Sequence, residues 1–130
     1  MKRVPLLALV LVLAACGADV SAPYSAKATE PCLAKLGWRV SARDADLGVI
    51  AAAAARGGLR VRIPKRNDLT LAFGSDAHDA VGLAKAVRRL ASPKLRPHLR
   101  DILMRERNAI LVWTVAPTVA DLQAVERCLS

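Results

Sequence analysis

The stretch "GLRVRIPKRNDLTLAF", Gly58 to Phe73, carries the clearest fold signal in the chain. Apolar residues alternate with arginines in its first half and with polar or small residues in its second, a period of two that is typical of strands with one buried face. The residues predicted to point into the core are Leu59, Val61, Ile63, Leu69, Leu71 and Phe73. Pro64 to Asp68 supply a polar turn between the halves. The stretch therefore predicts an antiparallel hairpin.

Helical patterns flank this hairpin on both sides. Before it, Asp44 and Asp46 precede an alanine-rich run that ends at Gly57-Gly58, and acidic residues suit the first turn of a helix. After it, Ser75 or Asp76 is placed to cap a helix running to about Ala91, with apolar residues at helical spacing and cations near its carboxyl end. We therefore expect one helix before the hairpin and one after it in the sequence.

Further elements are predicted near both ends of the chain. A short helix is expected to begin at Thr29 and end at Gly37, followed by a brief strand from Trp38 to Ser41. The segment from Ala109 to Val115 is apolar on both faces, which is typical of a central strand. Thr118 with Asp121 then resembles a capping box that opens a final helix.

The predicted order is helix, strand, helix, strand, strand, helix, strand, helix. This order predicts an α+β fold and resembles a ferredoxin-like split βαββαβ antiparallel sheet with added N- and C-terminal helices. Residues 99–104 are expected to add a helical turn before the loop "RERN". Such a sheet often has one face that its own two helices leave uncovered; we expect a terminal helix to cover it, the alternative being a docking surface. The residues on that face are Arg60, Arg62, Thr70, Ile110 and Val112.

The amino terminus has the layout of an export signal. Lys2 and Arg3 precede an apolar run from Val4 to Ala15. A membrane-spanning helix needs about 20 apolar residues, so this run fits the apolar region of a secretory leader better. The sequence predicts a signal peptide over residues 1–15.

The segment "LAAC", Leu13 to Cys16, resembles the lipobox of bacterial lipoproteins. The resemblance implies that the leader is cut before Cys16, that its thiol carries a diacylglyceryl group, and that its new amino terminus can be acylated, for example by palmitate. It also implies a protein anchored in the cell membrane and facing outside the cytoplasm. Residues 16–28 would be a flexible tether and residues 29–130 a single α+β domain. The alternative is cleavage after Gly17, which would release a soluble secreted protein.

Cysteine number supports a bridge in the mature domain. Three cysteines is an odd count, and setting Cys16 aside leaves Cys32 and Cys128, one near each end of the folded part. Compartments outside the cytoplasm are oxidising, so these two are predicted to form a structural disulfide. Neither has a second cysteine at the spacing of a redox motif.

The chain is basic, with a formal net charge of +9 from 20 basic and 11 acidic residues. Basic domains are attracted to anionic surfaces and ligands. Proteins that bind nucleic acids through a sheet usually expose stacking aromatics, whereas aromatic residues make up 3% of this chain, so we expect no nucleic-acid role. The candidate residues for binding an anionic envelope component are Arg60, Arg62, Lys65, Arg66, Arg105 and Arg107.

No constellation of residues predicts catalysis. Asp76, His78 and Asp79 are a cluster of histidine with carboxylates, but their place at a helix start fits capping better than a metal site, which needs three or four convergent ligands. His98 has no evident partner. We therefore expect no catalytic residue, metal or cofactor, and a role in binding or scaffolding at the cell envelope. The alternatives are a soluble binding module for an anionic ligand and an enzyme with an unrecognised site.

Overall fold

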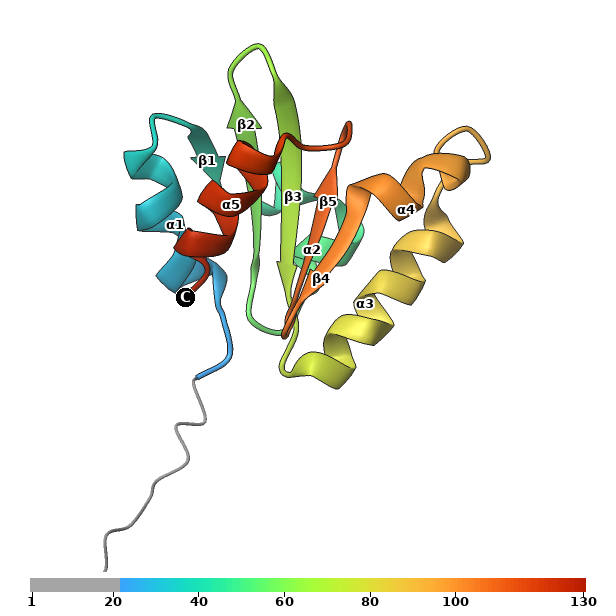
Figure 1. Cartoon of the computed structure of the whole chain (residues 1–130). Coiled ribbons are helices and arrows are strands. Elements are labelled where there is room, and N and C mark those ends of the chain that lie inside the picture. Colours follow the sequence, from blue (N-terminus) through green and yellow to red (C-terminus); the bar gives the residue numbers. More distant parts are fainter. Residues whose placement is uncertain (1–21) are drawn as a thin grey trace, which may run out of the picture.

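The computed structural model describes residues 22–130 and combines an antiparallel sheet of five strands with five α-helices (Figure 1). The predicted α+β class is confirmed. The predicted leader and Cys16 lie outside the described residues. Within the described range, no helix has the length and apolar character needed to cross a membrane.

The sheet is built around the predicted hairpin. Its strands are β1 (Arg39–Ser41), β2 (Gly58–Ile63), β3 (Asn67–Phe73), β4 (Leu103–Glu106) and β5 (Ala109–Trp113), in the spatial order β1-β2-β3-β5-β4. Leu59 pairs with Leu71 and Val61 with Leu69, so the two apolar rows share one face as predicted. Strand β5 was predicted to be central; it is paired on both sides, by β3 and β4, but the centre of the sheet is β3.

Side-chain caps begin three of the helices. The helices are α1 (Ala26–Lys35), α2 (Asp44–Ala52), α3 (Ala77–Leu90), α4 (Leu99–Ile102) and α5 (Val119–Cys128), with a 3₁₀ turn at Arg96–His98. Of the two candidate caps for α3, Ser75 and Asp76, Asp76 makes the capping bond, and Thr118 caps α5 as predicted. The predicted start at Thr29 is wrong, because Ser25 Oγ accepts a hydrogen bond from the backbone N–H of Ala28 and α1 begins at Ala26.

The strand order differs from that of a ferredoxin-like sheet, so this expectation is corrected. Strand β1 lies at the sheet edge and pairs antiparallel with β2, and α2 therefore joins neighbouring antiparallel strands instead of crossing between parallel ones. Strand β4 occupies part of the segment that we expected to be a helical turn and a loop. Since β3 and β4 both run antiparallel to β5, β3–α3–β4 is one split βαβ unit, with β5 in the split.

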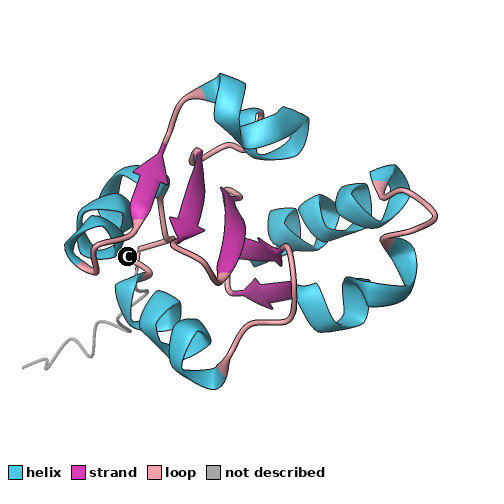
Figure 2. Ribbon diagram, turned by 90° about the horizontal axis from the view of Figure 1, so that it is seen from above, coloured by secondary structure: helices cyan, strands magenta, loops and turns pink. Residues whose placement is uncertain are grey.

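The two faces of the sheet are covered by different pairs of helices. Figure 2 shows helices on both sides of the strands. Terminal helices α1 and α5 pack on the apolar face, and α2 and α3 lie over the opposite face, so the expectation that a terminal helix covers Ile110 and Val112 is wrong. Gly58 permits the close approach of α2, since a Cβ there would lie 2.7 Å from the carbonyl oxygen of Ala51.

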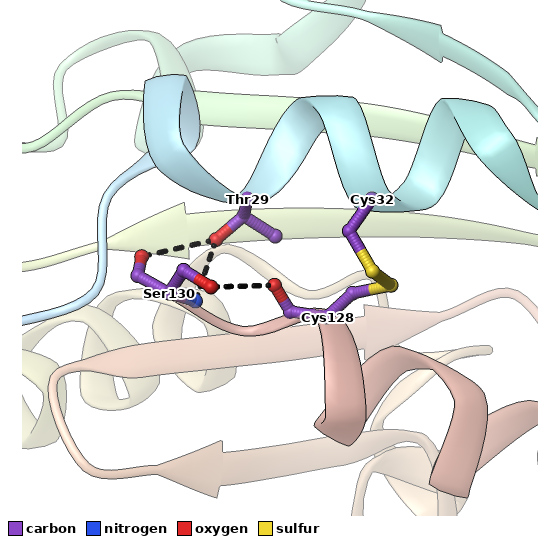
Figure 3. The surroundings of a disulfide bond; sticks show 4 residues. All are labelled: Thr29, Cys32, Cys128 and Ser130. Atoms are coloured by element: carbon purple, nitrogen blue, oxygen red, sulfur yellow. Dashed lines mark hydrogen bonds between the residues drawn. A yellow bond between two sulfur atoms is a disulfide. The ribbon is translucent and has the colours of Figure 1, made fainter.

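A disulfide between Cys32 and Cys128 joins α1 to α5, which confirms the predicted pairing (Figure 3). Beside it, the hydroxyl of Thr29 donates a hydrogen bond to the backbone oxygen of Ser130 at 3.2 Å and accepts one from its N–H at 3.1 Å. Thr29 is fully buried. The two terminal helices are therefore fastened by a covalent bond and a polar contact, lying side by side.

The segment before α1 is held against the turn between β4 and β5. The buried side chain of Asn108 accepts a hydrogen bond from the N–H of Tyr24 and donates to the carbonyl oxygens of Tyr24 and Gly74, each at 2.8 Å. The guanidinium of Arg107 stacks on the Tyr24 ring, 4.4 Å from its centroid. These contacts fix Tyr24 against the β4–β5 turn.

Candidate functional site

A polar groove of about 520 Å³ lies where β1 and β2 meet the amino-terminal half of α2. We call it the arginine groove. Its lining residues are Arg39, Val40, Ser41, Arg43, Ala45, Asp46, Arg60 and Arg62. Four guanidinium groups and one carboxylate thus line the same hollow, which gives it a strong positive charge.

The pairing register of β1 and β2 brings three of these arginines close together. Arg60 and Arg62 are two residues apart on β2 and therefore point to the same face of the sheet. Across the β1–β2 pair, Arg39 lies directly opposite Arg62 and Ser41 opposite Arg60. Like charges directly opposite each other destabilise a sheet. Repulsion among Arg39, Arg60 and Arg62 therefore destabilises this part of the sheet, and a negative charge nearby would reduce the repulsion.

Two carboxylates neutralise part of this charge. Asp68 accepts hydrogen bonds from Arg60 Nη2 at 3.3 Å and from Arg62 Nε at 3.2 Å. Asp46 accepts one from Arg43 Nε at 3.0 Å. Among residues 22–130, Arg39 has no ion pair through its side chain, and the buried Nε of Arg60 has no hydrogen-bond partner. Three of the four groove arginines therefore share two carboxylates, and Arg39 adds a positive charge that no carboxylate among the described residues pairs with.

Asp46 acts as a fixed counter-charge. Its Oδ2 accepts a hydrogen bond from Ser41 Oγ at 2.6 Å, and this bond, followed by the one from Arg43, lowers the pKa of Asp46 below its ordinary value. A lowered pKa keeps the carboxylate ionised at neutral pH. Asp46 consequently holds Arg43 at the rim of the groove and has no proton to donate there.

The structure does not bring together the six residues proposed from the sequence. Arg60 and Arg62 line the arginine groove, but Lys65 and Arg66 lie in the β2–β3 turn, and Arg66 makes two hydrogen bonds to Asp121, at 2.9 and 3.2 Å. The remaining two lie at the opposite edge of the sheet, Arg105 exposed on β4 and Arg107 in the turn that follows it. Only the first pair belongs to the groove.

Sequence reasoning missed Arg39 and Arg43. Arg39 lies on a strand of three residues, and its position opposite Arg62 depends on a register that no local pattern reveals. Arg43 precedes α2 and reaches the groove through its ion pair with Asp46. The spacing of Arg43 and Asp46, three residues apart at a helix start, was the available signal.

The cluster around His78 serves the start of α3. Asp76 Oδ1 accepts a hydrogen bond from the N–H of Asp79 at 2.7 Å, and Asp79 Oδ2 accepts one from the N–H of Ser75 at 2.8 Å. His78 is exposed. Over the described part of the chain, no group of three or more histidine, cysteine or acidic residues is arranged to hold a metal ion.

The chemistry of the arginine groove is that of anion recognition, because guanidinium groups match the geometry of phosphate, sulfate and carboxylate oxygens. Comparisons of this chain with protein families, with curated proteins and with solved structures find no match.

Proposed function

We propose that the protein is a small, non-catalytic binding module of the cell envelope, and that the arginine groove takes its anionic ligand. The observation that carries the proposal is an excess of positive charge: three of the four groove arginines pair with two carboxylates, and Arg39, directly opposite Arg62, forms no ion pair among the described residues. A bound anion would reduce the repulsion between these two side chains.

We further propose that the protein is exported and anchored in the membrane through lipidated Cys16. The lipobox-like segment Leu13–Cys16, placed after a basic start and a short apolar run, supports this proposal. The Cys32–Cys128 disulfide supports export, because disulfides persist mainly in oxidising compartments.

Binding of inorganic pyrophosphate tests the groove. Isothermal titration calorimetry of the purified protein at low salt is expected to show binding that weakens as sodium chloride is added, because salt screens charge–charge attraction. Arg39→Gln is expected to weaken this binding about tenfold, the effect of losing one charge-assisted hydrogen bond. Arg127→Gln removes an exposed cation from α5, away from the groove, and is expected to leave binding unchanged.

Two results would contradict the proposed function. One is the absence of heat from pyrophosphate at any salt concentration. The other is an equal weakening by Arg39→Gln and Arg127→Gln, which would mean that net charge attracts the anion and the groove does not. Thermal unfolding of both variants checks that each remains folded.

Intact mass tests the anchor. Protein extracted from membranes is expected to start at Cys16 and to carry the mass of a diacylglyceryl group. Cys16→Ser removes the acceptor thiol and is expected to move the protein out of the membrane fraction. A mature chain without added lipid mass, or one that stays in the membrane after Cys16→Ser, would be evidence against the anchor.

A further inference from the structure

Next to the arginine groove lies a second, apolar groove of about 340 Å³, between α2 and α3. Thr70, Ala72, Ile110 and Val112 line it from strands β3 and β5, and the remaining lining residues, Leu47, Gly48, Val49, Ile50, Ala51, Val87 and Leu90, come from the two helices. No charged residue lines it. Its volume lies within the range of about 300–1,000 Å³ found for small-molecule sites.

The rim of this apolar groove exposes large side chains to water. Val49 is 81% exposed and Leu90 is 68% exposed. Apolar surface at the mouth of an apolar hollow is typical of a binding site. The kink in α2 at Gly48, where φ is +75°, separates the part of the helix beside the arginine groove from the part that carries Val49.

The two grooves adjoin along one row of the sheet. On the face that α2 and α3 cover, cross-strand pairing places Arg60 beside Thr70 and Thr70 beside Val112. Arg60 lines the arginine groove, and Thr70 and Val112 line the apolar groove. Two strand spacings separate Arg60 from Val112, about 10 Å. A ligand of ordinary size can therefore contact both grooves at once.

We propose that the two grooves form one site for a single-chain anionic amphiphile, with its head group on Arg39, Arg60 and Arg62 and its alkyl chain over Thr70 and Val112. The inference rests on the proposed function and names the ligand class for the same groove. A free anion would leave the apolar walls in contact with water, and an uncharged apolar molecule would leave the excess positive charge of the arginines unbalanced. An alkyl phosphate, a fatty acid and a monoacyl phospholipid share the chemistry that satisfies both parts.

Three probes separate the contributions of the head group and the chain. Dodecyl phosphate, ethyl phosphate and dodecyl maltoside are titrated below their micellar concentrations into protein carrying Cys16→Ser, which has no thiol at residue 16 to carry a lipid of its own. Dodecyl phosphate is expected to bind at least about tenfold more tightly than either other probe, because burial of methylene groups adds to the ionic contacts. Monoacyl phospholipid and fatty acid then distinguish between the natural head groups.

Matched variants assign the two ends of the ligand. Leu90→Glu puts a charge at the rim of the apolar groove and is expected to remove the advantage of dodecyl phosphate over ethyl phosphate. Val119→Glu makes the same change at a side chain that is 71% exposed on α5 and is expected to have no effect. Arg60→Gln is expected to weaken the binding of both phosphates.

The outcomes distinguish this inference from the proposed function. Equal affinity for dodecyl and ethyl phosphate would overturn the amphiphile site and leave anion binding standing. Equal affinity for dodecyl phosphate and dodecyl maltoside would overturn both, since the head group would then contribute nothing. Self-association that Leu90→Glu abolishes, with no amphiphile bound, would assign the apolar groove to a second copy of the chain and overturn the inference.

Discussion

Removing the Cys32–Cys128 disulfide as Cys32→Ala/Cys128→Ala is expected to lower the free energy of unfolding by about 4–5 kcal/mol. The two cysteines are 96 residues apart in the sequence, so the bond closes a loop that spans most of the described domain. Breaking so long a loop returns much conformational freedom to the unfolded chain. Typical domains have stabilities of only about 5–15 kcal/mol, so the loss is expected to make the domain marginally stable.

Urea unfolding of three samples tests this expectation. Alanine is chosen because Cys128 is 2% exposed, and a serine hydroxyl there would be buried. Reduced wild-type protein serves as the control, since it loses the same bond without any change of side chain. Both are expected to unfold at similar, much lower urea concentrations than the oxidised protein. A difference below about 1 kcal/mol between oxidised and reduced protein would contradict the expected loop-closure effect.

The elements that were predicted correctly are those specified by local chemistry. The β2–β3 hairpin follows from strict alternation on both sides of a polar turn, and the starts of α3 and α5 follow from Asp76 and Thr118, whose side chains cap them. The disulfide follows from cysteine number and predicted export. Each of these signals lies within a few residues or depends on a simple count.

Strand β4 was missed because its turn carries no local signal. The hairpin with β5 turns at Arg107-Asn108, and Arg107 has a φ of +53°, a conformation for which glycine is the usual residue. Along Leu103–Glu106, the side chains do not alternate clearly between apolar and polar. A buried asparagine and its bonds to distant residues hold this turn, and no local pattern reports them.

Which helices cover each face of the sheet depends on packing between residues far apart in the sequence. The position of the two grooves depends on the same packing. Helix α2 is rich in alanine and apolar on several sides, so its sequence does not indicate which face of the sheet it contacts. The sequence placed Arg60, Arg62, Thr70, Ile110 and Val112 on one face, which the structure confirms. It could not show that α2 and α3 would divide this face into a charged and an apolar groove.

Asn108→Asp is expected to destabilise the domain by about 2–4 kcal/mol, although it changes the side-chain shape very little. Asn108 is 2% exposed, and its amide nitrogen donates hydrogen bonds to the carbonyl oxygens of Tyr24 and Gly74. A carboxylate has no hydrogen to donate, so its oxygen would face two carbonyl oxygens without water. Leaving buried polar groups unsatisfied costs about 1–3 kcal/mol each, and more when a charge is involved.

Asn67→Asp provides the matched control. Asn67 also bonds the backbone through both ends of its amide, donating to the carbonyl oxygen of Val115 at 2.9 Å and accepting from its N–H at 3.1 Å, but at an exposed site. Water can replace these bonds, so a loss below about 1 kcal/mol is expected. Chemical denaturation of both variants measures the difference.

Hydrogen exchange locates the effect of Asn108→Asp. Because Asn108 holds the segment that precedes α1, the N–H of Tyr24 is expected to exchange faster in this variant, together with its loss of global stability. Equal destabilisation by Asn108→Asp and Asn67→Asp, or unchanged exchange at Tyr24, would contradict a role for Asn108 in joining Tyr24 to Gly74. The same bonds position the ring of Tyr24 under Arg107. Asn108 therefore fixes the position of Tyr24, at the opposite end of β2 and β3 from the turn that carries Lys65 and Arg66.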